Sequence, residues 1–105
     1  MILFFRKLFG LGPKADFTDL IQNKNAYIVD VRTPGEFKNG HVKGSVNIPL
    51  QSFASADKKL KGKEPIILCC ASGARSGQAT SMLKSKGFAE VYNGGSWHSV
   101  NRFKK

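Results

Sequence analysis

The chain has 105 residues, of which 41% are hydrophobic and 23% charged, as in one ordinary globular domain and unlike a disordered chain. Its 17 Lys and Arg residues against 7 Asp and Glu residues give a net charge of +10. A field of this kind attracts small anions, and nucleic acid only non-specifically. No spaced set of Cys and His residues is typical of a metal site, so we expect no metal.

The first 14 residues, MILFFRKLFGLGPK, form an apolar and basic extension, and we assign residues 15–105 to the domain. Arg6 and Lys7 interrupt the apolar run, which therefore does not fit an export signal and is too short to span a membrane. We expect the extension to dock on the domain through its Phe and Leu residues. Contact of residues 1–9 with a membrane surface or a partner is the alternative.

Helices and strands alternate through the first half of the domain. ADFTDLIQNKN (15–25) predicts a short helix, and AYIVDV (26–31) predicts a buried strand. Thr33 is the expected N-cap of the next helix, with a proline in its first turn. A short strand at Val46–Ile48 ends at Pro49, which cannot continue a sheet ladder.

The same alternation continues to the C-terminus. Residues 54–65 are polar and Lys-rich and predict a weak helix, followed by the apolar strand PIILCC. RSGQATSMLKSKGF (75–88) predicts a longer helix, AEVYNGG (89–95) a strand and SWHSVNRF (96–103) a last helix. Strands separated by helices are typical of an α/β protein, so we expect three layers, with a mainly parallel central sheet flanked by helices.

The only two cysteines, Cys69 and Cys70, are adjacent at the end of a predicted strand. Adjacent Cα atoms lie about 3.8 Å apart, below the usual disulfide range of roughly 4.4–6.8 Å. We therefore expect free thiols in a reducing compartment, and a cytoplasmic protein. If Cys70 points into the following loop, Cys69 faces the other side of the sheet and packs against a helix. A resolving role for Cys69 is the alternative.

A loop of small residues joins this strand to the next helix. Ligands of parallel sheets bind beyond the carboxyl ends of the strands, and the loop amides and helix N-terminus there suit an anion or a thiolate. We predict that Cys70 is a catalytic nucleophile; the alternative is a core residue at a strand end. Gly73 permits the turn. The predicted binding residues of the loop are Ala71, Ser72, Gly73, Ala74, Arg75 and Ser76.

Three motifs occur in the order found in a known family: VDVRTPGEFKNGHVKGSVNIPL (29–50), CASGARSG (70–77) and VYNGGSW (91–97). With them the domain resembles a single-domain rhodanese, a sulfurtransferase. The resemblance implies a rhodanese-like domain in which Cys70 takes a sulfane sulfur from thiosulfate or another persulfide donor. The sulfur then passes to cyanide or a thiol, and no cofactor is required. Asp30 and Arg32 match the D-x-R strand end of the family, which we interpret as support of the loop, with hydrogen bonds from its amides to Asp30.

Two features of the loop bear on its substrate. Four residues separate Cys70 from Arg75, whereas phosphatases of similar fold have five, so the shorter loop suits a persulfide better than a phosphate. Two-domain rhodaneses that use thiosulfate well have basic residues after the cysteine, but Ala71 and Ser72 follow it here. A sulfur-relay or protein-interaction module, loaded by a partner protein and turning over little thiosulfate, therefore stays open.

The expected partners follow from this reading. They are a small anionic sulfur donor and a thiol or cyanide acceptor, with no specific nucleic acid, and nothing in the sequence demands more than a monomer. The lysines of the polar segment are either a solvated face or a dock for an acidic partner protein. These lysines are Lys58, Lys59, Lys61 and Lys63.

Overall fold

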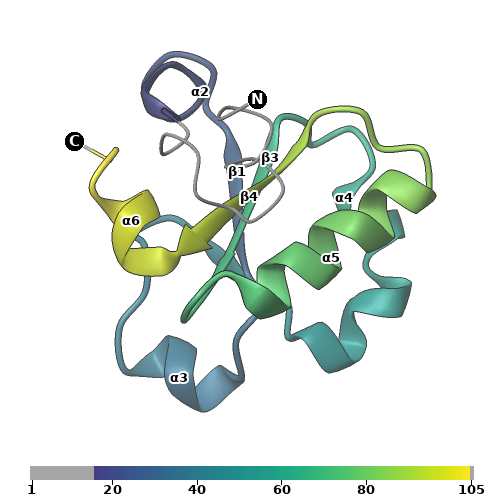
Figure 1. Cartoon of the computed structure of the whole chain (residues 1–105), viewed down its shortest axis with the longest axis horizontal. Coiled ribbons are helices and arrows are strands. Elements are labelled where there is room, and N and C mark those ends of the chain that lie inside the picture. Colours follow the sequence, from purple (N-terminus) through teal and green to yellow (C-terminus); the bar gives the residue numbers. More distant parts are fainter. Residues whose placement is uncertain (1–15, 105) are drawn as a thin grey trace, which may run out of the picture.

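A four-stranded parallel sheet forms the centre of the computed structural model, which describes residues 16–104 (Figure 1). Its spatial order is β2-β1-β3-β4, and each neighbouring pair is parallel, so all carboxyl ends lie at one end of the sheet. The predicted α/β fold with a mainly parallel sheet is confirmed. The strands are β1 (Tyr27–Asp30), β2 (Val46–Asn47), β3 (Ile66–Cys70) and β4 (Val91–Ser96).

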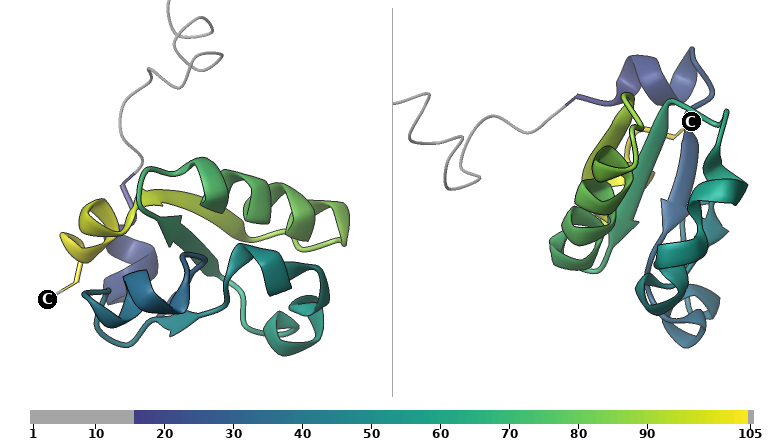
Figure 2. Two further views of the ribbon diagram at one scale, coloured as in Figure 1. Left: turned by 90° about the horizontal axis from the view of Figure 1, so that it is seen from below. Right: turned by 90° about the vertical axis from the view of Figure 1, so that its right-hand side faces the viewer.

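Helices cover both faces of this sheet and complete the three predicted layers (Figures 1 and 2). One face packs against η1, α4 and α5, and the other packs against α2 and α6. The short helix α3 lies at the carboxyl end of the strands (Figure 1). The helices are α2 (Thr18–Gln22), α3 (Pro34–Lys38), the 3₁₀-helix η1 (Leu50–Ser55), α4 (Asp57–Leu60), α5 (Ala74–Ser85) and α6 (Trp97–Asn101).

Alternation along β3 divides the core into two clusters. Ile66, Leu68 and Cys70 pack with α4 and α5. Ile67 and Cys69 pack with α2 and α6. All five residues are buried, as expected of an inner strand covered on both faces. The two cysteines therefore point to opposite faces, and Cys69 packs against helices as predicted.

Local signals account for most element boundaries. Thr33 caps α3 as predicted, since its hydroxyl accepts from the amide of Glu36 and the Glu36 carboxylate accepts from the amide of Thr33, a reciprocal capping box. The sequence analysis did not predict η1. Phe53 is the one buried residue of this helix, and a single buried residue gives no apolar periodicity. The helix predicted over residues 54–65 is shorter and spans Asp57–Leu60.

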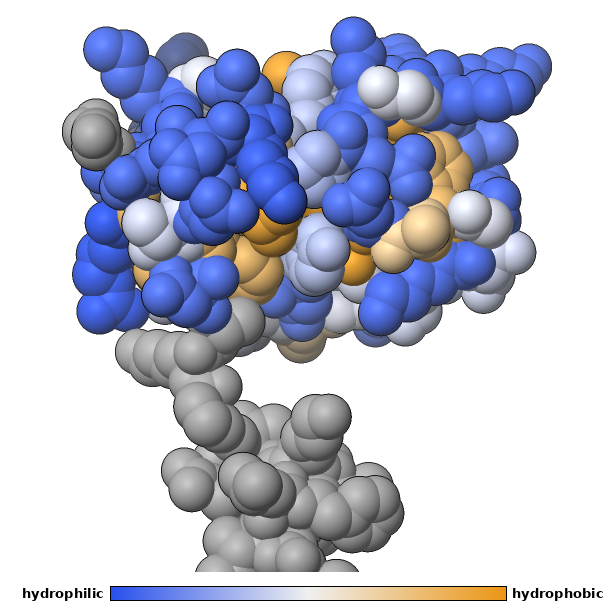
Figure 3. Space-filling view, turned by 90° about the horizontal axis from the view of Figure 1, so that it is seen from above, coloured by the Kyte–Doolittle hydropathy of each residue, from blue (hydrophilic) through white to orange (hydrophobic). Residues whose placement is uncertain are grey.

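The predicted N-terminal extension, residues 1–14, lies outside the described residues, and its docking stays a prediction. Within residues 16–104, every helix is too short or too polar to cross a bilayer. At the end of the molecule opposite α3, hydrophilic side chains cover most of the surface and hydrophobic ones show only in patches between them (Figure 3).

Candidate active site

Cys70 is the last residue of β3, and its buried thiol lies under the loop that leads to α5. Its Sγ accepts hydrogen bonds from the amide of Gly73 at 2.9 Å and from the amide and hydroxyl of Ser76, both at 3.4 Å. Burial raises the pKa of the Cys70 thiol. The hydroxyl and amide of Ser76, with the amides of Gly73 and Ser72, outweigh burial and hold that pKa below its ordinary value. The loop thus presents its donors to the sulfur atom itself.

Gly73 and Asn93 set the shape of this loop. Gly73 has a φ of 103° at the N-cap of α5, and a Cβ there would lie 3.2 Å from the Cα of Gly95. The positive φ therefore favours glycine, and the close approach leaves little room for a side chain. The Nδ2 of Asn93 donates to the carbonyl of Gly73 at 3.0 Å, and its Oδ1 accepts from the amide of Gly95 at 3.0 Å. Asn93 was missed by the sequence analysis; its position before a Gly-Gly pair at a strand end was the available signal.

A bulge in β4 brings Asn93 into this position. Gly94 is the extra residue, opposite the step from Leu68 to Cys69 in β3. A Cβ at Gly94 would lie 2.5 Å from a methyl of Val100 and 2.7 Å from a methyl of Ile67. A side chain at Gly94 would therefore force the neighbouring side chains of Val100 and Ile67 to move.

The hydroxyl of Ser76 has two acceptors within reach, the Oδ1 of Asn93 and the Sγ of Cys70. It lies 2.7 Å from the Oδ1 of Asn93 and 3.4 Å from the Sγ of Cys70. The two hydrogen bonds are alternatives, because a hydroxyl has a single proton to donate. The amides of Gly73 and Ser76 have no such competition, so they are the constant part of the donor set around the sulfur.

Arg75 lies in the predicted loop but is paired with a carboxylate. Its Nη1 and Nη2 donate to the two carboxylate oxygens of Glu36 at 2.8 Å and 3.0 Å. The guanidinium of Arg75, followed by the amide of Thr33, lowers the pKa of the Glu36 carboxyl to about 2. This bidentate pair joins α3 to the first turn of α5, directly after the loop. The structure therefore gives Arg75 a structural partner in place of a free charge directed at a substrate.

Asp30 and Arg32 form a buried ion pair of their own. The carboxylate of Asp30 accepts from the amide and Nε of Arg32, each at 3.0 Å, and from its Nη2 at 2.7 Å. Arg32 also donates to the carbonyl of Gly40 at 2.6 Å and lies 4.9 Å from the ring centre of Trp97. The predicted hydrogen bonds from the loop amides to Asp30 are wrong, because its side-chain donors come from Arg32. The pair joins the end of β1 to α6 and to the turn at Gly40.

The remaining predicted loop residues carry no charge. Ala71, Ser72 and Ala74 are exposed on the surface above the buried thiol. An incoming molecule therefore meets small neutral side chains and backbone amides at this point. Arg75 is the one cationic residue among residues 71–76.

Cys69 and the two histidines lie apart from this chemistry. Burial, followed by the charge of Asp30, raises the pKa of Cys69 to about 12, so it stays a neutral thiol at pH 7. The ring of His41 stacks on Phe37 and its Nδ1 lies 2.7 Å from the Phe37 carbonyl oxygen, while His98 is exposed. In the part of the chain that the structure describes, no cluster of three His, Cys, Asp or Glu residues is placed to hold a metal ion.

The sulfur of Cys70 lies against loop amides and a helix N-terminus, at the carboxyl end of a parallel sheet. This arrangement is that of an α/β domain with a cysteine in an anion-binding loop. Residues 14–100 match the Rhodanese-like domain family. The chain belongs to that family, and the resemblance noted from its motifs is confirmed.

Individual relatives agree with this assignment. The uncharacterized protein YqhL of Bacillus subtilis is 37% identical over 70 residues, which are 67% of this chain and 56% of YqhL. The chain thus spans little more than half of that relative. The thiosulfate sulfurtransferase GlpE of Vibrio cholerae is 31% identical over 86 residues, 78% of this chain and 81% of GlpE. Among solved structures, a rhodanese-related protein from Thermoplasma volcanium has 28% identity and a TM-score of 0.68, over 88% of this chain and 94% of that one.

Proposed function

We propose that the protein is a sulfurtransferase that carries a sulfane sulfur as a persulfide on Cys70. The observation that supports this most directly is the set of three hydrogen bonds that Gly73 and Ser76 donate to the sulfur. These donors favour the thiolate, which is the form of cysteine that attacks sulfur. Membership of the rhodanese-like family and the named activity of the GlpE relative support the same chemistry.

The proposed reaction has two steps. In the first, the Cys70 thiolate attacks the outer sulfur of thiosulfate, a new S–S bond forms, and sulfite leaves with the electron pair of the broken S–S bond. In the second, cyanide or a thiolate attacks the outer sulfur of the persulfide, and the Cys70 thiolate leaves. The loop donors stabilise the thiolate at the start and at the end of this ping-pong cycle.

A sulfur relay, loaded by a partner protein rather than by thiosulfate, is the second candidate. It is favoured by the charge of the loop, because Ala71 and Ser72 are neutral and Arg75 is paired with Glu36. Thiosulfate is a dianion, and a loop without a free cation stabilises it only through amides. An acidic partner fits the exposed lysines of residues 58–63 and the net charge of +10.

Intact mass spectrometry of the reduced protein tests both candidates. The protein is incubated with thiosulfate, or with a persulfidated protein, beside Cys69→Ser and Cys70→Ser. We expect the mass of one added sulfur atom in the native protein and in Cys69→Ser, and none in Cys70→Ser. Loading by the persulfidated protein alone identifies the relay. An added sulfur that survives in Cys70→Ser, or no added sulfur from either donor, contradicts the proposed function.

A further inference from the structure

A small pocket adjoins the Cys70 loop at the carboxyl end of β1. Its volume is about 280 Å³. Arg75, in the first turn of α5 next to the buried Ser76, forms part of its wall, and Val31 and Leu50 pack in the same cluster as Cys70. The thiol itself is buried, and the amide of Val31 donates to the carbonyl of Cys69, so this pocket lies beside the strand end that carries Cys70. The lining residues are Val31, Thr33, Pro49, Leu50, Gln51 and Arg75.

The polar groups of this pocket are largely engaged within the protein. Arg75 is its one charged lining residue, and both of its bonded nitrogens face Glu36. The hydroxyl of Thr33 donates to the same carboxylate at 3.1 Å and accepts from the Glu36 amide. The pocket therefore presents mainly hydrocarbon, from Val31, Pro49 and Leu50, to anything that enters it.

We propose that this pocket binds the apolar substituent of a low-molecular-weight thiol or of its persulfide, and so selects alkyl or aryl sulfur compounds over charged ones. The inference rests on the proposed function, since it assigns the substrate class of the same cysteine. Burial of each methylene group stabilises the bound state, whereas a dianion gains no free cation in this pocket. Burial of the apolar substituent thereby supplies the binding free energy that a free cation in the loop would otherwise supply.

The transfer step is symmetric between donor and acceptor. A thiolate RS⁻ attacks the outer sulfur of the Cys70 persulfide, an S–S bond forms in RSSH, and the bond to Sγ breaks. The electron pair of that bond goes to Sγ, and the proton stays on the transferred sulfur, so no oxidant or reductant is required. The reverse step loads Cys70 from RSSH through the same transition state, and the group R lies in the same pocket in both directions.

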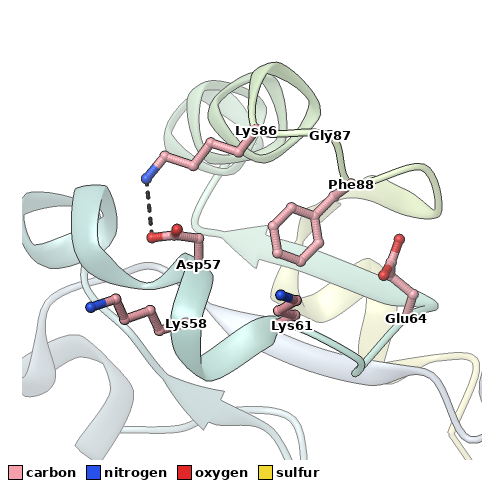
Figure 4. Close-up of a pocket in the computed structure, with 7 residues that line it drawn as sticks. All are labelled: Asp57, Lys58, Lys61, Glu64, Lys86, Gly87 and Phe88. Atoms are coloured by element: carbon pink, nitrogen blue, oxygen red, sulfur yellow. Dashed lines mark hydrogen bonds and ion pairs between the residues drawn. The ribbon is translucent and has the colours of Figure 1, made fainter.

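A second, larger hollow of about 400 Å³ has a different character. It lies near the amino ends of β3 and β4, at the end of the sheet away from Cys70. Phe88 points into it, Lys58 and Lys61 lie on its rim, and Lys86 is joined to Asp57 at 3.1 Å (Figure 4). Its distance along the strands from the thiol excludes it as the subsite for the group R.

A chain-length series tests the proposal on the native protein. Cys70 is loaded with sulfur, and the rate of its discharge is measured with ethanethiol, butanethiol and hexanethiol, whose thiol pKa values are nearly equal. The same thiols react with glutathione persulfide as the reference. Each fully buried methylene group accelerates discharge about fourfold. We expect the hexanethiol-to-ethanethiol rate ratio to be at least about tenfold larger on the protein than on glutathione persulfide.

Two variants assign the effect to this pocket. Leu50→Asn replaces an apolar wall by a polar side chain of similar branched shape and should flatten the dependence on chain length. Leu20→Asn changes an equally half-buried leucine on the opposite face of the sheet and should preserve it. Gln51→Trp fills the exposed rim and should slow hexanethiol more than ethanethiol, which keeps the test open if Leu50→Asn does not fold.

The outcomes separate the two proposals. Equal rate ratios on the native protein and on glutathione persulfide overturn the pocket but leave sulfur transfer standing. A chain-length dependence that persists in folded Leu50→Asn, and in Gln51→Trp, also overturns it. Failure of every donor, including an alkyl persulfide, to load Cys70 overturns the proposed function, and this inference with it.

Discussion

Replacing Ser76 by alanine removes the side-chain donor that faces the sulfur of Cys70. Ser76 is fully buried in the first turn of α5, with its Oγ 3.4 Å from Sγ and 2.7 Å from the Oδ1 of Asn93. After the substitution Oδ1 still accepts from the amide of Gly95. Alanine also favours a helix more than serine does. The variant therefore keeps its fold and changes mainly the stabilisation of the thiolate.

The size of the change follows from the geometry of this one donor. A hydrogen bond to a charged group contributes about 1.5–3 kcal/mol. The 3.4 Å distance and the competition from Asn93 place the hydroxyl of Ser76 at the lower end. Since about 1.4 kcal/mol corresponds to one pKa unit, we expect the midpoint of thiolate formation to rise by about one pH unit. The amides of Gly73 and Ser76 remain, so part of the stabilisation persists.

The assay is a pH titration of the ultraviolet absorbance of the thiolate. A Cys69→Ala background leaves Cys70 as the only thiol, and burial of the sulfur does not interfere with this readout. Ser81→Ala, on the exposed face of the same helix, is the matched control and should leave the midpoint in place. A midpoint in Ser76→Ala that is unchanged or lower would refute the donor role of the hydroxyl.

Three further outcomes test the scaffold. Gly94→Ala forces a Cβ within 2.7 Å of two methyl groups and should destabilise the fold by about 1–3 kcal/mol in urea unfolding, whereas Gly35→Ala meets nothing within 4 Å and should not. Asp30→Asn leaves the guanidinium of Arg32 buried without its counter-charge and should cost about 3 kcal/mol in the same measurement; a loss below 1 kcal/mol would contradict the pairing. Glu36→Gln should lower the melting temperature at pH 7, and its difference from the native protein should shrink as the pH falls from 4.5 towards about 2, because the native carboxylate then becomes protonated.

The parts of the molecule that the sequence predicted correctly depend on short-range chemistry. Runs such as AYIVDV and PIILCC are too short and too apolar for surface helices, and they form β1 and β3. The capping box at Thr33 needs only residues within one helical turn. Gly73 was identified because a loop of small residues between a strand and a helix requires a turn, and it has a positive φ there. In each case neighbours along the chain were sufficient.

The features that the sequence could not predict join segments far apart in the chain. The spacing from Cys70 places Arg75 at the end of the loop but does not say which way its side chain points, because its partner, Glu36, is 39 positions away. Asn93 is 20 positions from the carbonyl of Gly73 that it holds, and it reaches that carbonyl only because β4 contains a bulge. Motif spacing therefore predicted the position of the Cys70 sulfur and of the amides around it. The charge around the sulfur depends on the contact between Arg75 and Glu36, which spacing does not show. With Arg75 paired, fixed dipoles remain to stabilise a Cys70 thiolate. In the function that we propose, discrimination among sulfur donors therefore depends on the apolar wall beside the loop rather than on a cation within it.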